Sequence, residues 1–235
     1  MKIGLLDADH CSFIACYNKV GEEPKNWEQV QLDIDSYITR IFRITGCTHY
    51  IGALTMGKGF RYTVYPEYKA NRKFKDPLPF LKESKQHMID KWGFVFHTQL
   101  EADDIVNICK LKLGDEAFIM SPDKDLLYLE GKSYNPKSGE WINVSREEAQ
   151  LFFNKSLVTG DGVDNIKGLP KKGEAYFDKL EDKSLPSVFN EYIKHFGEFK
   201  GVEEFYKNYM CLKIRDTYED YEIPELKEFK GNYEF

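Results

Sequence analysis

Acidic residues are grouped at three places along the sequence, with spacings that suit metal-dependent chemistry. The groups are Asp7 with Asp9, then Glu101, Asp103 and Asp104, then Asp123 with Asp125. Crowded carboxylates repel one another unless cations neutralise them, and oxygen ligands with few histidines favour Mg²⁺ or Mn²⁺ over zinc. Taken singly, each group is also explained as a turn or as a cap at the start of a helix.

Four short apolar runs predict buried strands, at residues 2–6, 49–54, 93–97 and 117–120. Apolar residues with helical spacing lie between or after these runs, at 34–42, 78–92 and 102–113. This alternation predicts an α/β fold with a mostly parallel sheet flanked by helices. Functional residues of such a sheet gather at the carboxyl ends of its strands, where the three acidic groups fall.

The sequence changes character after residue 144, where the strand pattern fades. Ser145 and Glu148 predict a capping box at the start of a helix. A glycine-rich turn at 160–173 follows, and then helical segments to about residue 215. The last twenty residues are acidic and rich in Tyr and Glu. We therefore expect an α/β core over 1–144, a helical region over 145–215 and a peripheral acidic tail over 216–235.

Composition narrows the class of protein. The net charge of −6 conceals a basic stripe at residues 58–91, which holds nine Lys or Arg against four Asp or Glu. Such a stripe suits phosphate binding, although a solvated helix face explains it equally well. The early acidic residue at position 7 argues against a signal peptide. Five cysteines without a CxxC pair indicate a reducing compartment, and we expect a cytoplasmic protein.

Five segments, in this order, resemble a known family. They are LLDAD (5–9), FRYTVYPEYKANR (60–72), EADD (101–104), SPDKDLLYL (121–129) and VTGDGVDNIKGLPKKG (158–173). As an ordered set they resemble the 5′-nucleases, which include flap endonucleases, the 5′-nuclease domain of bacterial DNA polymerases and bacteriophage 5′-3′ exonucleases. The resemblance runs from residue 5 to about 177. The compact chain favours a bacteriophage-type exonuclease, which would act in the host cytoplasm.

The resemblance implies a PIN-like α/β domain and a helix-three-turn-helix element that grips duplex DNA. It also implies two divalent ions, Mg²⁺ or Mn²⁺, held by carboxylates at the scissile phosphate. Carried over by motif, the metal ligands are Asp7, Glu101, Asp103, Asp123, Asp125, Asp161 and Asp164, with Asp104 nearby. Regular helical spacing pairs Glu101 with Asp104, so only the resemblance favours Asp103. The motif does not require Asp9, for which we expect a turn role or an indirect one.

Basic and aromatic residues of the same segments are expected to contact DNA. Lys69 and Arg72 resemble the family's cationic pair, which offsets charge on the attacked phosphate. Tyr68 is expected either to stack on a terminal base or to pack as an ordinary tyrosine. Phosphate contacts are expected from a further set, Lys58, Arg61, Lys73, Lys75, Lys171 and Lys172. The implied activity is hydrolysis of phosphodiester bonds at or near 5′ ends of DNA, with RNA–DNA hybrids as an open alternative substrate.

The chain departs from the family pattern at three places. An aspartate usual after the second strand is absent, because residues 53–56 read Ala-Leu-Thr-Met. Lys171 stands where the family commonly has glycine, which weakens a turn that binds a potassium ion in relatives. Only 28 residues separate Arg72 from Glu101, so the arch region (69–100) is short. The choice between exonuclease and flap-endonuclease action therefore stays open.

Three other functions remain as alternatives. In a haloacid-dehalogenase-like phosphatase, Asp7 would be the nucleophile and Asp9 the acid-base, but the YKANR and EADD segments would be unexplained. A catalytically impaired DNA-binding relative would account for the missing aspartate. A PIN-type ribonuclease would share the fold, although the GDGVDNIKGLP segment argues for a duplex-binding element that such enzymes lack.

Overall fold

The computed structural model describes residues 1–18, 23–72, 78–219 and 221–231. The chain forms two compact units. The first, called the sheet unit, comprises residues 1–57, 75–144 and 215–235, and the second, called the helical unit, comprises 58–74 and 145–214. Every helix in the described ranges is too short or too polar to span a lipid bilayer.

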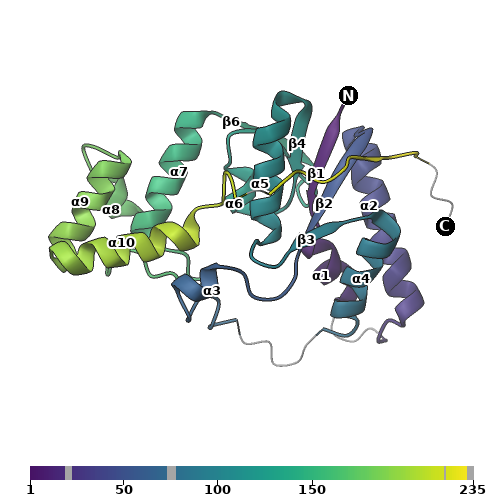
Figure 1. Cartoon of the computed structure of the whole chain (residues 1–235), viewed down its shortest axis with the longest axis horizontal. Helices are drawn as coiled ribbons and strands as arrows, with labels where there is room; N and C mark the ends of the chain where they lie inside the picture. The colour runs from purple at the N-terminus through teal and green to yellow at the C-terminus, as the bar shows by residue number, and fades with distance from the viewer. Residues whose placement is uncertain (19–22, 73–77, 220, 232–235) are drawn as a thin grey trace. The chain divides into compact units, whose positions relative to one another are not determined.

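The sheet unit is built on a mostly parallel sheet with the strand order β3-β2-β1-β4-β5-β6 (Figure 1). Its strands are β1 (Ile3–Asp7), β2 (His49–Thr55), β3 (Val95–His97), β4 (Ala117–Met120), β5 (Gly131–Asn135) and β6 (Glu140–Val144). The first five in this order run parallel, and β6 is antiparallel to β5. The register pairs Asp7 with Ala53 and Leu6 with Met120. The carboxyl ends of β1, β2 and β4 therefore lie side by side.

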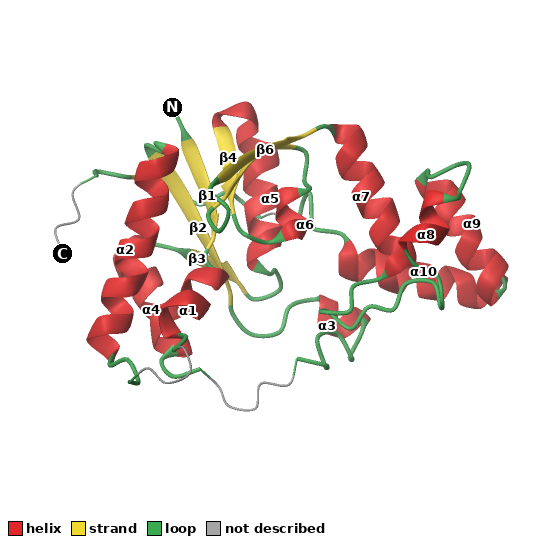
Figure 2. Ribbon diagram, turned by 180° about the vertical axis from the view of Figure 1, so that it is seen from behind, coloured by secondary structure: helices red, strands yellow, loops and turns green. Residues whose placement is uncertain are grey.

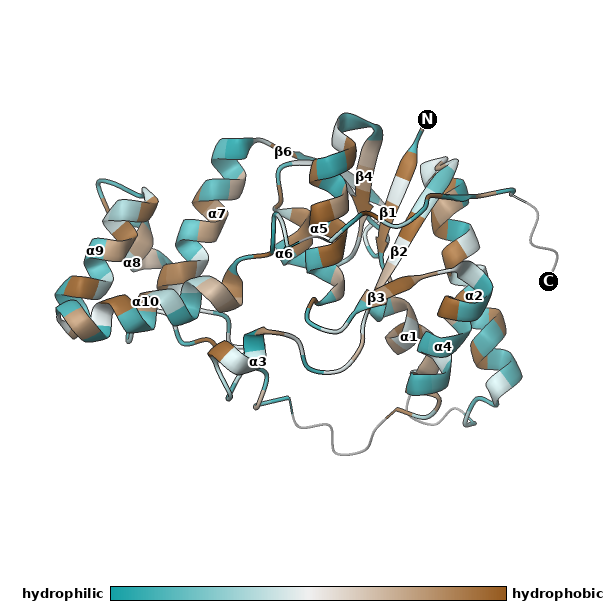
Figure 3. Ribbon diagram, viewed as in Figure 1, coloured by the Kyte–Doolittle hydropathy of each residue, from teal (hydrophilic) through white to brown (hydrophobic). Residues whose placement is uncertain are grey.

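Helices cover both faces of this sheet, as predicted. Figure 2 shows α1 (Asp9–Cys16), α2 (Trp27–Thr45) and α4 (Leu81–Trp92) on one side, with α5 (Ala102–Leu113) on the other. Ile34, Ile38 and Phe42 of α2 are fully buried and pack in one cluster with Trp92 of α4. Figure 3 shows the apolar colouring of β1, β2 and α5 that this burial requires. A short 3-10 turn (Gly114–Glu116) and α6 (Lys124–Leu127) flank β4.

All four predicted strands are confirmed, and α5 has the predicted bounds. The hairpin of β5 and β6 was not predicted. Its strands read GKSYN and EWINV, in which polar residues interrupt any apolar run. The aromatic pair of Tyr134 and Trp141, with ring centroids 5.2 Å apart, holds the two strands across the hairpin.

The predicted peripheral tail is instead part of the sheet unit. β7 (Lys227–Glu228) pairs antiparallel with the first residues of β2, at His49 and Tyr50. Phe229 follows it and packs on Phe42, with ring centroids 5.3 Å apart. β3 pairs with the other end of β2, at Ala53–Thr55, so two short strands cover one edge of β2. A strand of two residues has no periodicity that a sequence pattern can detect.

The helical unit contains α3 (Arg61–Val64), α7 (Arg146–Thr159), α8 (Glu174–Asp178), α9 (Leu185–Phe196) and α10 (Glu198–Leu212). Its own core includes Leu157, Phe177, Val188 and Tyr192. The predicted start of α7 is confirmed, because Ser145 and Glu148 form the reciprocal capping box. The helical character expected over 145–215 is therefore present. Residues 58–74, expected in the α/β core, belong to this unit.

Arg61 joins residues 58–74 to the end of α10. Its side chain is 2% exposed. Its guanidinium donates to the carbonyl oxygens of Cys211, at 2.9 Å, and Lys213, at 3.2 Å. The expected phosphate contact from Arg61 is therefore wrong, because a guanidinium committed to buried carbonyls is not presented to a ligand.

Replacing Arg61 with methionine is expected to lower the free energy of unfolding by about 1–3 kcal/mol, because buried carbonyl acceptors lose their donor. Urea unfolding followed by circular dichroism measures this change. Lys58→Met is the matched control, since Lys58 is exposed in the same segment, and it should stay within about 0.5 kcal/mol of the native chain. Equal stability of the two variants would contradict a structural role for Arg61.

Candidate active site

Asp7 lies at the carboxyl end of β1, where the sheet holds it among polar groups. Its side chain is buried. One carboxylate oxygen accepts a hydrogen bond from Ser121 Oγ, at 3.0 Å, and the other accepts from the Asp9 backbone amide, at 3.3 Å. Ser121 follows β4, the neighbour of β1, so the parallel pairing of the two strands brings these groups together.

The pKa of Asp7 is raised from 3.8 to about 7. Burial is the largest cause, and the negative charges of Asp9 and Asp123 add to it, while the hydrogen bond from Ser121 opposes it. A buried carboxylate beside other carboxylates is stabilised by a bound cation, which favours its ionised form. The donor chemistry at this edge of the sheet thus fits a hard divalent ion.

Replacing Asp7 with asparagine is expected to stabilise the metal-free protein at pH 8 by about 1–2 kcal/mol. The pKa of Asp7 rises on folding from 3.8 to about 7, so its contribution to stability falls as pH rises through this window. The gain should therefore shrink at pH 5. Thermal unfolding in EDTA at the two pH values tests this, with the exposed Asp115→Asn as control. A stability gain that is the same at both pH values would contradict the raised pKa of Asp7.

Asp123 and Asp125 lie just after β4, at the start of α6. Asp123 caps this short helix, since its carboxylate accepts from the Asp125 amide at 2.9 Å. The Asp123 amide in turn donates to Ser121 Oγ at 3.0 Å. Ser121 thus touches both Asp7 and Asp123 and fixes their relative placement, a role the sequence analysis missed because a single serine carries no pattern.

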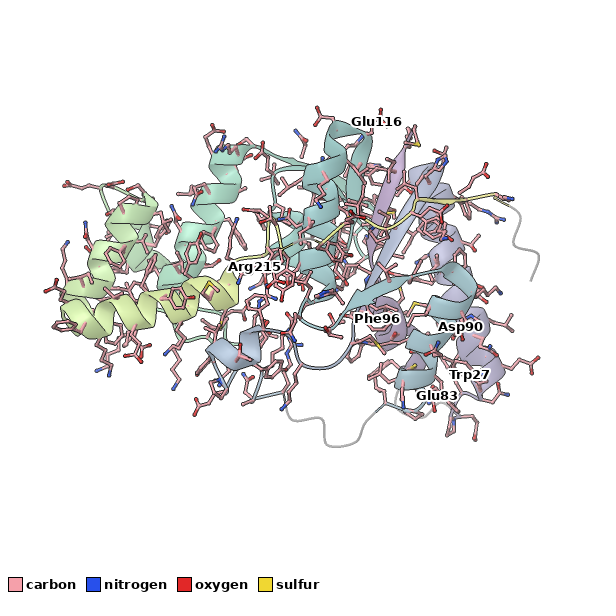
Figure 4. All side chains as sticks on the ribbon, viewed as in Figure 1. Trp27, Glu83, Asp90, Phe96, Glu116 and Arg215 are labelled. Carbon is pink, nitrogen blue, oxygen red and sulfur yellow. The ribbon has the colours of Figure 1, made fainter. Side chains whose placement is uncertain are left out.

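Glu101, Asp103 and Asp104 surround the first turn of α5. Asp104 is fully buried, and its two carboxylate oxygens accept from the amides of Glu101, at 3.1 Å, and Arg215, at 2.9 Å. Glu101 and Asp104 are thus paired, as their helical spacing predicted, but the contact is a backbone cap in which the Asp104 carboxylate accepts from the Glu101 amide. These contacts favour a structural role for Asp104, at the point where the chain returns to the sheet unit at Arg215, labelled in Figure 4.

In the helical unit, Asp164 lies at the centre of the predicted cationic group. Its carboxylate accepts from the Tyr68 hydroxyl at 2.8 Å, pairs with Lys69 Nζ at 3.8 Å and forms a close ion pair with Arg72. The Lys69 amide also donates to the Asp164 carbonyl, at 3.0 Å. Lys69 has a φ of 57°, in the left-handed region. Segments about ninety-five residues apart in sequence are thus joined at one acidic residue.

Tyr68 is packed rather than available for base stacking. Its side chain is 2% exposed, and its ring lies edge-on to Tyr62, with centroids 5.3 Å apart. Ile166 and Cys211 complete the cluster. The stacking role considered for Tyr68 is therefore contradicted, and the packed-tyrosine interpretation accounts for it.

The glycine-rich turn at 160–173 is closed tightly. Asp161 and Ile166 exchange backbone hydrogen bonds at 2.8 Å, and the Asp161 carboxylate accepts from the Val163 amide at 2.7 Å. A Cβ on Gly160 would lie 2.2 Å from the carbonyl oxygen of Ile166, so only glycine fits there. Lys171 has a φ of 61°. Glycine adopts this left-handed conformation at less cost than lysine does.

Three of the remaining lysines predicted to contact DNA lie within the described residues. Lys58 and Lys171 are exposed, and Lys172 lies over the Tyr176 ring, with Nζ 3.9 Å from the centroid. Lys73 and Lys75 lie outside the described residues. All five cysteines are buried.

The predicted metal ligands are divided between the two units. Asp7, Glu101, Asp103, Asp104, Asp123 and Asp125 belong to the sheet unit, and Asp161 and Asp164 to the helical unit. Within the described ranges, no three Asp, Glu, His or Cys side chains are close enough to hold an ion. The carboxylate oxygens are thus of the kind that bind a divalent ion, but the described side chains do not lie close enough together to coordinate one.

Comparison with curated sequences finds nucleases and polymerases. A 5′-3′ exonuclease of Buchnera aphidicola subsp. Schizaphis graminum is 25% identical over 199 residues, covering 72% of this chain and 65% of the exonuclease. DNA polymerase I of Streptococcus pneumoniae serotype 4 is 30% identical over 173 residues, covering 60% of this chain and 19% of the polymerase. The chain therefore spans less than two thirds of either relative. No model of a known protein family matches it.

Solved structures share the fold at low identity. The flap endonuclease of bacteriophage T5, in a complex with DNA and metal ions, has a TM-score of 0.70 and 18% identity, covering 90% of this chain and 89% of the other. The catalytic core of Rad2 in complex with DNA substrate has a TM-score of 0.52 and 16% identity, covering 89% of this chain and 65% of the other.

The fold is thus the PIN-like α/β fold, a mostly parallel sheet flanked by helices, as in the bacteriophage T5 structure. Relatives named 5′-3′ exonuclease bear out the resemblance to the 5′-nucleases, and the bacteriophage T5 structure shares the fold.

Proposed function

We propose that this chain is a divalent-metal-dependent 5′-nuclease that hydrolyses phosphodiester bonds at or near 5′ ends of DNA. The observation that carries this is the buried Asp7 at the edge of the sheet, whose pKa is raised by burial and by Asp9 and Asp123. Such a group favours a bound cation. The names of the exonuclease relatives and the DNA and metal ions of the phage T5 structure support the same function.

The proposed metal ligands in the sheet unit are Asp7, Glu101, Asp103, Asp123 and Asp125. In the helical unit, the resemblance adds Asp161 and Asp164. The ions, Mg²⁺ or Mn²⁺, would activate water and steady the leaving oxygen. Asp104 is proposed to cap α5 rather than to bind metal, since backbone amides occupy its carboxylate.

The chain's own cations are proposed to bind the phosphate. Lys69 and Arg72 would offset its charge, and Asp164 orients both of them through the ion pairs described above. The helical unit is proposed to hold duplex DNA through a helix-three-turn-helix element around residues 158–177. Lys58, Lys171 and Lys172 would supply sequence-independent phosphate contacts there, so binding should weaken as salt rises.

Asp9 argues against the phosphatase alternative. Its carboxylate is engaged by Lys85 Nζ at 2.8 Å and by the Thr55 amide at 3.1 Å. A general acid-base must exchange a proton with the substrate, and an aspartate held in an ion pair is poorly suited to this.

Cleavage of 5′-labelled substrates tests the proposal. Flap, nicked, blunt and RNA–DNA hybrid duplexes are each incubated with Mg²⁺, with Mn²⁺ and with EDTA. Metal-dependent release of 5′ products is expected, and product length separates exonuclease from flap-endonuclease action. Duplex binding without cleavage would instead identify a catalytically impaired relative. The absence of both cleavage and duplex binding would overturn the proposal.

A further inference from the structure

Thr55, which ends β2, lies within residues 53–56, the stretch where the family resemblance led us to expect an aspartate. Its side chain has a different task. Its hydroxyl accepts from the backbone amide of Ala102, the first residue of α5, at 2.9 Å. The end of β2 is thus tied to the start of the helix that follows Glu101, and this position supplies no carboxylate.

A carboxylate nevertheless lies at the end of β2, because Asp9 reaches it from the β1–α1 connection. The two oxygens of Asp9 accept from the Thr55 amide at 3.1 and 3.3 Å. The Asp9 amide donates to the carboxylate of Asp7, at 3.3 Å. Asp9 is therefore fixed between the predicted ligand Asp7 and Thr55 at the end of β2.

Lys85 brings a positive charge to the same place. It lies on α4, between Glu83 and Asp90, which Figure 4 labels. Its ammonium donates to Asp9 Oδ1 at 2.8 Å and to the Thr55 carbonyl at 2.6 Å. The Lys85 side chain is 17% exposed and that of Asp9 is 27% exposed. Two acceptors at hydrogen-bond distance hold the ammonium in one position at the edge of the sheet.

We propose that Lys85 is a built-in counter-cation: it neutralises Asp9, keeps that carboxylate from binding metal, and thereby sets a weaker affinity for divalent ions at the sheet edge. Lys85 is a positioning residue in this role. The inference rests on the proposed function, since it concerns the same metal-binding edge. In the place of a carboxylate after β2, this chain carries an ion pair with no net charge.

The test measures Mn²⁺ binding to the full chain by isothermal titration calorimetry, without DNA. Lys85→Met should lower the Kd for Mn²⁺ at least about fivefold, because Asp9 is released and a nearby positive charge is removed. The double variant Asp9→Asn with Lys85→Met removes both charges, and its Kd should stay within about twofold of the native chain.

Lys91→Met is the matched control. Lys91 lies on the same helix and also pairs with an aspartate, Asp35, at 2.8 Å. Its loss changes the net charge equally, so an effect confined to Lys85→Met is local. Lys85→Arg, which keeps the charge, should retain the native Kd.

Three results would overturn the inference. The first is a native Kd in Lys85→Met. The second is a Kd raised about tenfold or more in the double variant, which would make Asp9 a direct ligand. The third is no Mn²⁺ binding by the native chain. If Lys85→Met does not fold, Lys85→Gln, which removes the same charge but keeps a polar side chain beside the Thr55 carbonyl, is expected to lower the Kd in the same way, and a native Kd in that variant would equally overturn the inference. Normal Mn²⁺ binding without DNA cleavage would count against the proposed nuclease function only.

Discussion

Replacing Asp123 with alanine is expected to slow DNA cleavage by about a hundred- to a thousandfold, the loss seen when one electrostatic partner of a transition state is removed. Asp123 follows β4 and contributes to the charge that raises the pKa of Asp7. Its removal leaves a proposed ion without one oxygen ligand. Single-turnover cleavage of the best 5′-labelled substrate, at saturating Mg²⁺, measures the effect.

Asp115→Ala is the matched control for this substitution. Asp115 is exposed in the turn that precedes β4, whereas Asp123 follows β4 at its other end. The control loses the same charge and should cleave at the native rate. Duplex binding, measured by fluorescence anisotropy in Ca²⁺, should be close to native in both variants. Native turnover by Asp123→Ala would refute the assignment of the sheet edge as the catalytic centre.

Replacing Lys69 with alanine is expected to slow the single-turnover rate by about a hundredfold, with a much smaller effect on folding. Lys69 pairs with Asp164 through its side chain, and its ammonium lies 4.7 Å from the centre of the Tyr68 ring. The substitution removes the charge proposed to offset the phosphate. It leaves the hydrogen bond of Tyr68 to Asp164 in place.

The control for Lys69 is Lys179→Ala, an exposed lysine of the same unit that follows α8. It should leave the rate unchanged. Circular dichroism and thermal unfolding of Lys69→Ala establish that the helical unit is intact. A rate within a few-fold of native in a folded Lys69→Ala would make Lys69 an ordinary surface lysine.

The fold was predictable where one element carries its own pattern. The run AFIM at 117–120 and the periodic segment of α5 were identified with the observed bounds. Ser145 and Glu148 identified the start of α7 because a capping box is local in sequence. The β5–β6 hairpin and β7 were missed, since their stability comes from pairing with distant strands rather than from their own composition.

The sequence indicated which types of residue form the candidate site, but not which other residues their side chains contact. The acidic groups of the sheet unit were identified because each is a short motif near a strand end, whereas Asp161 and Asp164 came from the family resemblance. Arg61 was assigned to DNA because it lies in a basic segment, and Tyr68 was considered for base stacking because it lies beside Lys69 and Arg72. Both are buried by contacts with residues about a hundred or more positions away. Lys85 was counted only as part of the basic stripe, and nothing local indicates that it pairs with Asp9. Interactions over such separations leave no periodic signal.

The pairing of β7 with β2 has a consequence for folding during synthesis. Residues 227–229 leave the ribosome after the rest of the described sheet, yet they cover the backbone edge at His49 and Tyr50 and the ring of Phe42. Until then, the nascent sheet exposes an unpaired strand edge beside an aromatic surface, the kind of edge that recruits other chains. Chains that terminate prematurely before β7 would keep this edge open. They are therefore expected to associate with one another or to be held by chaperones.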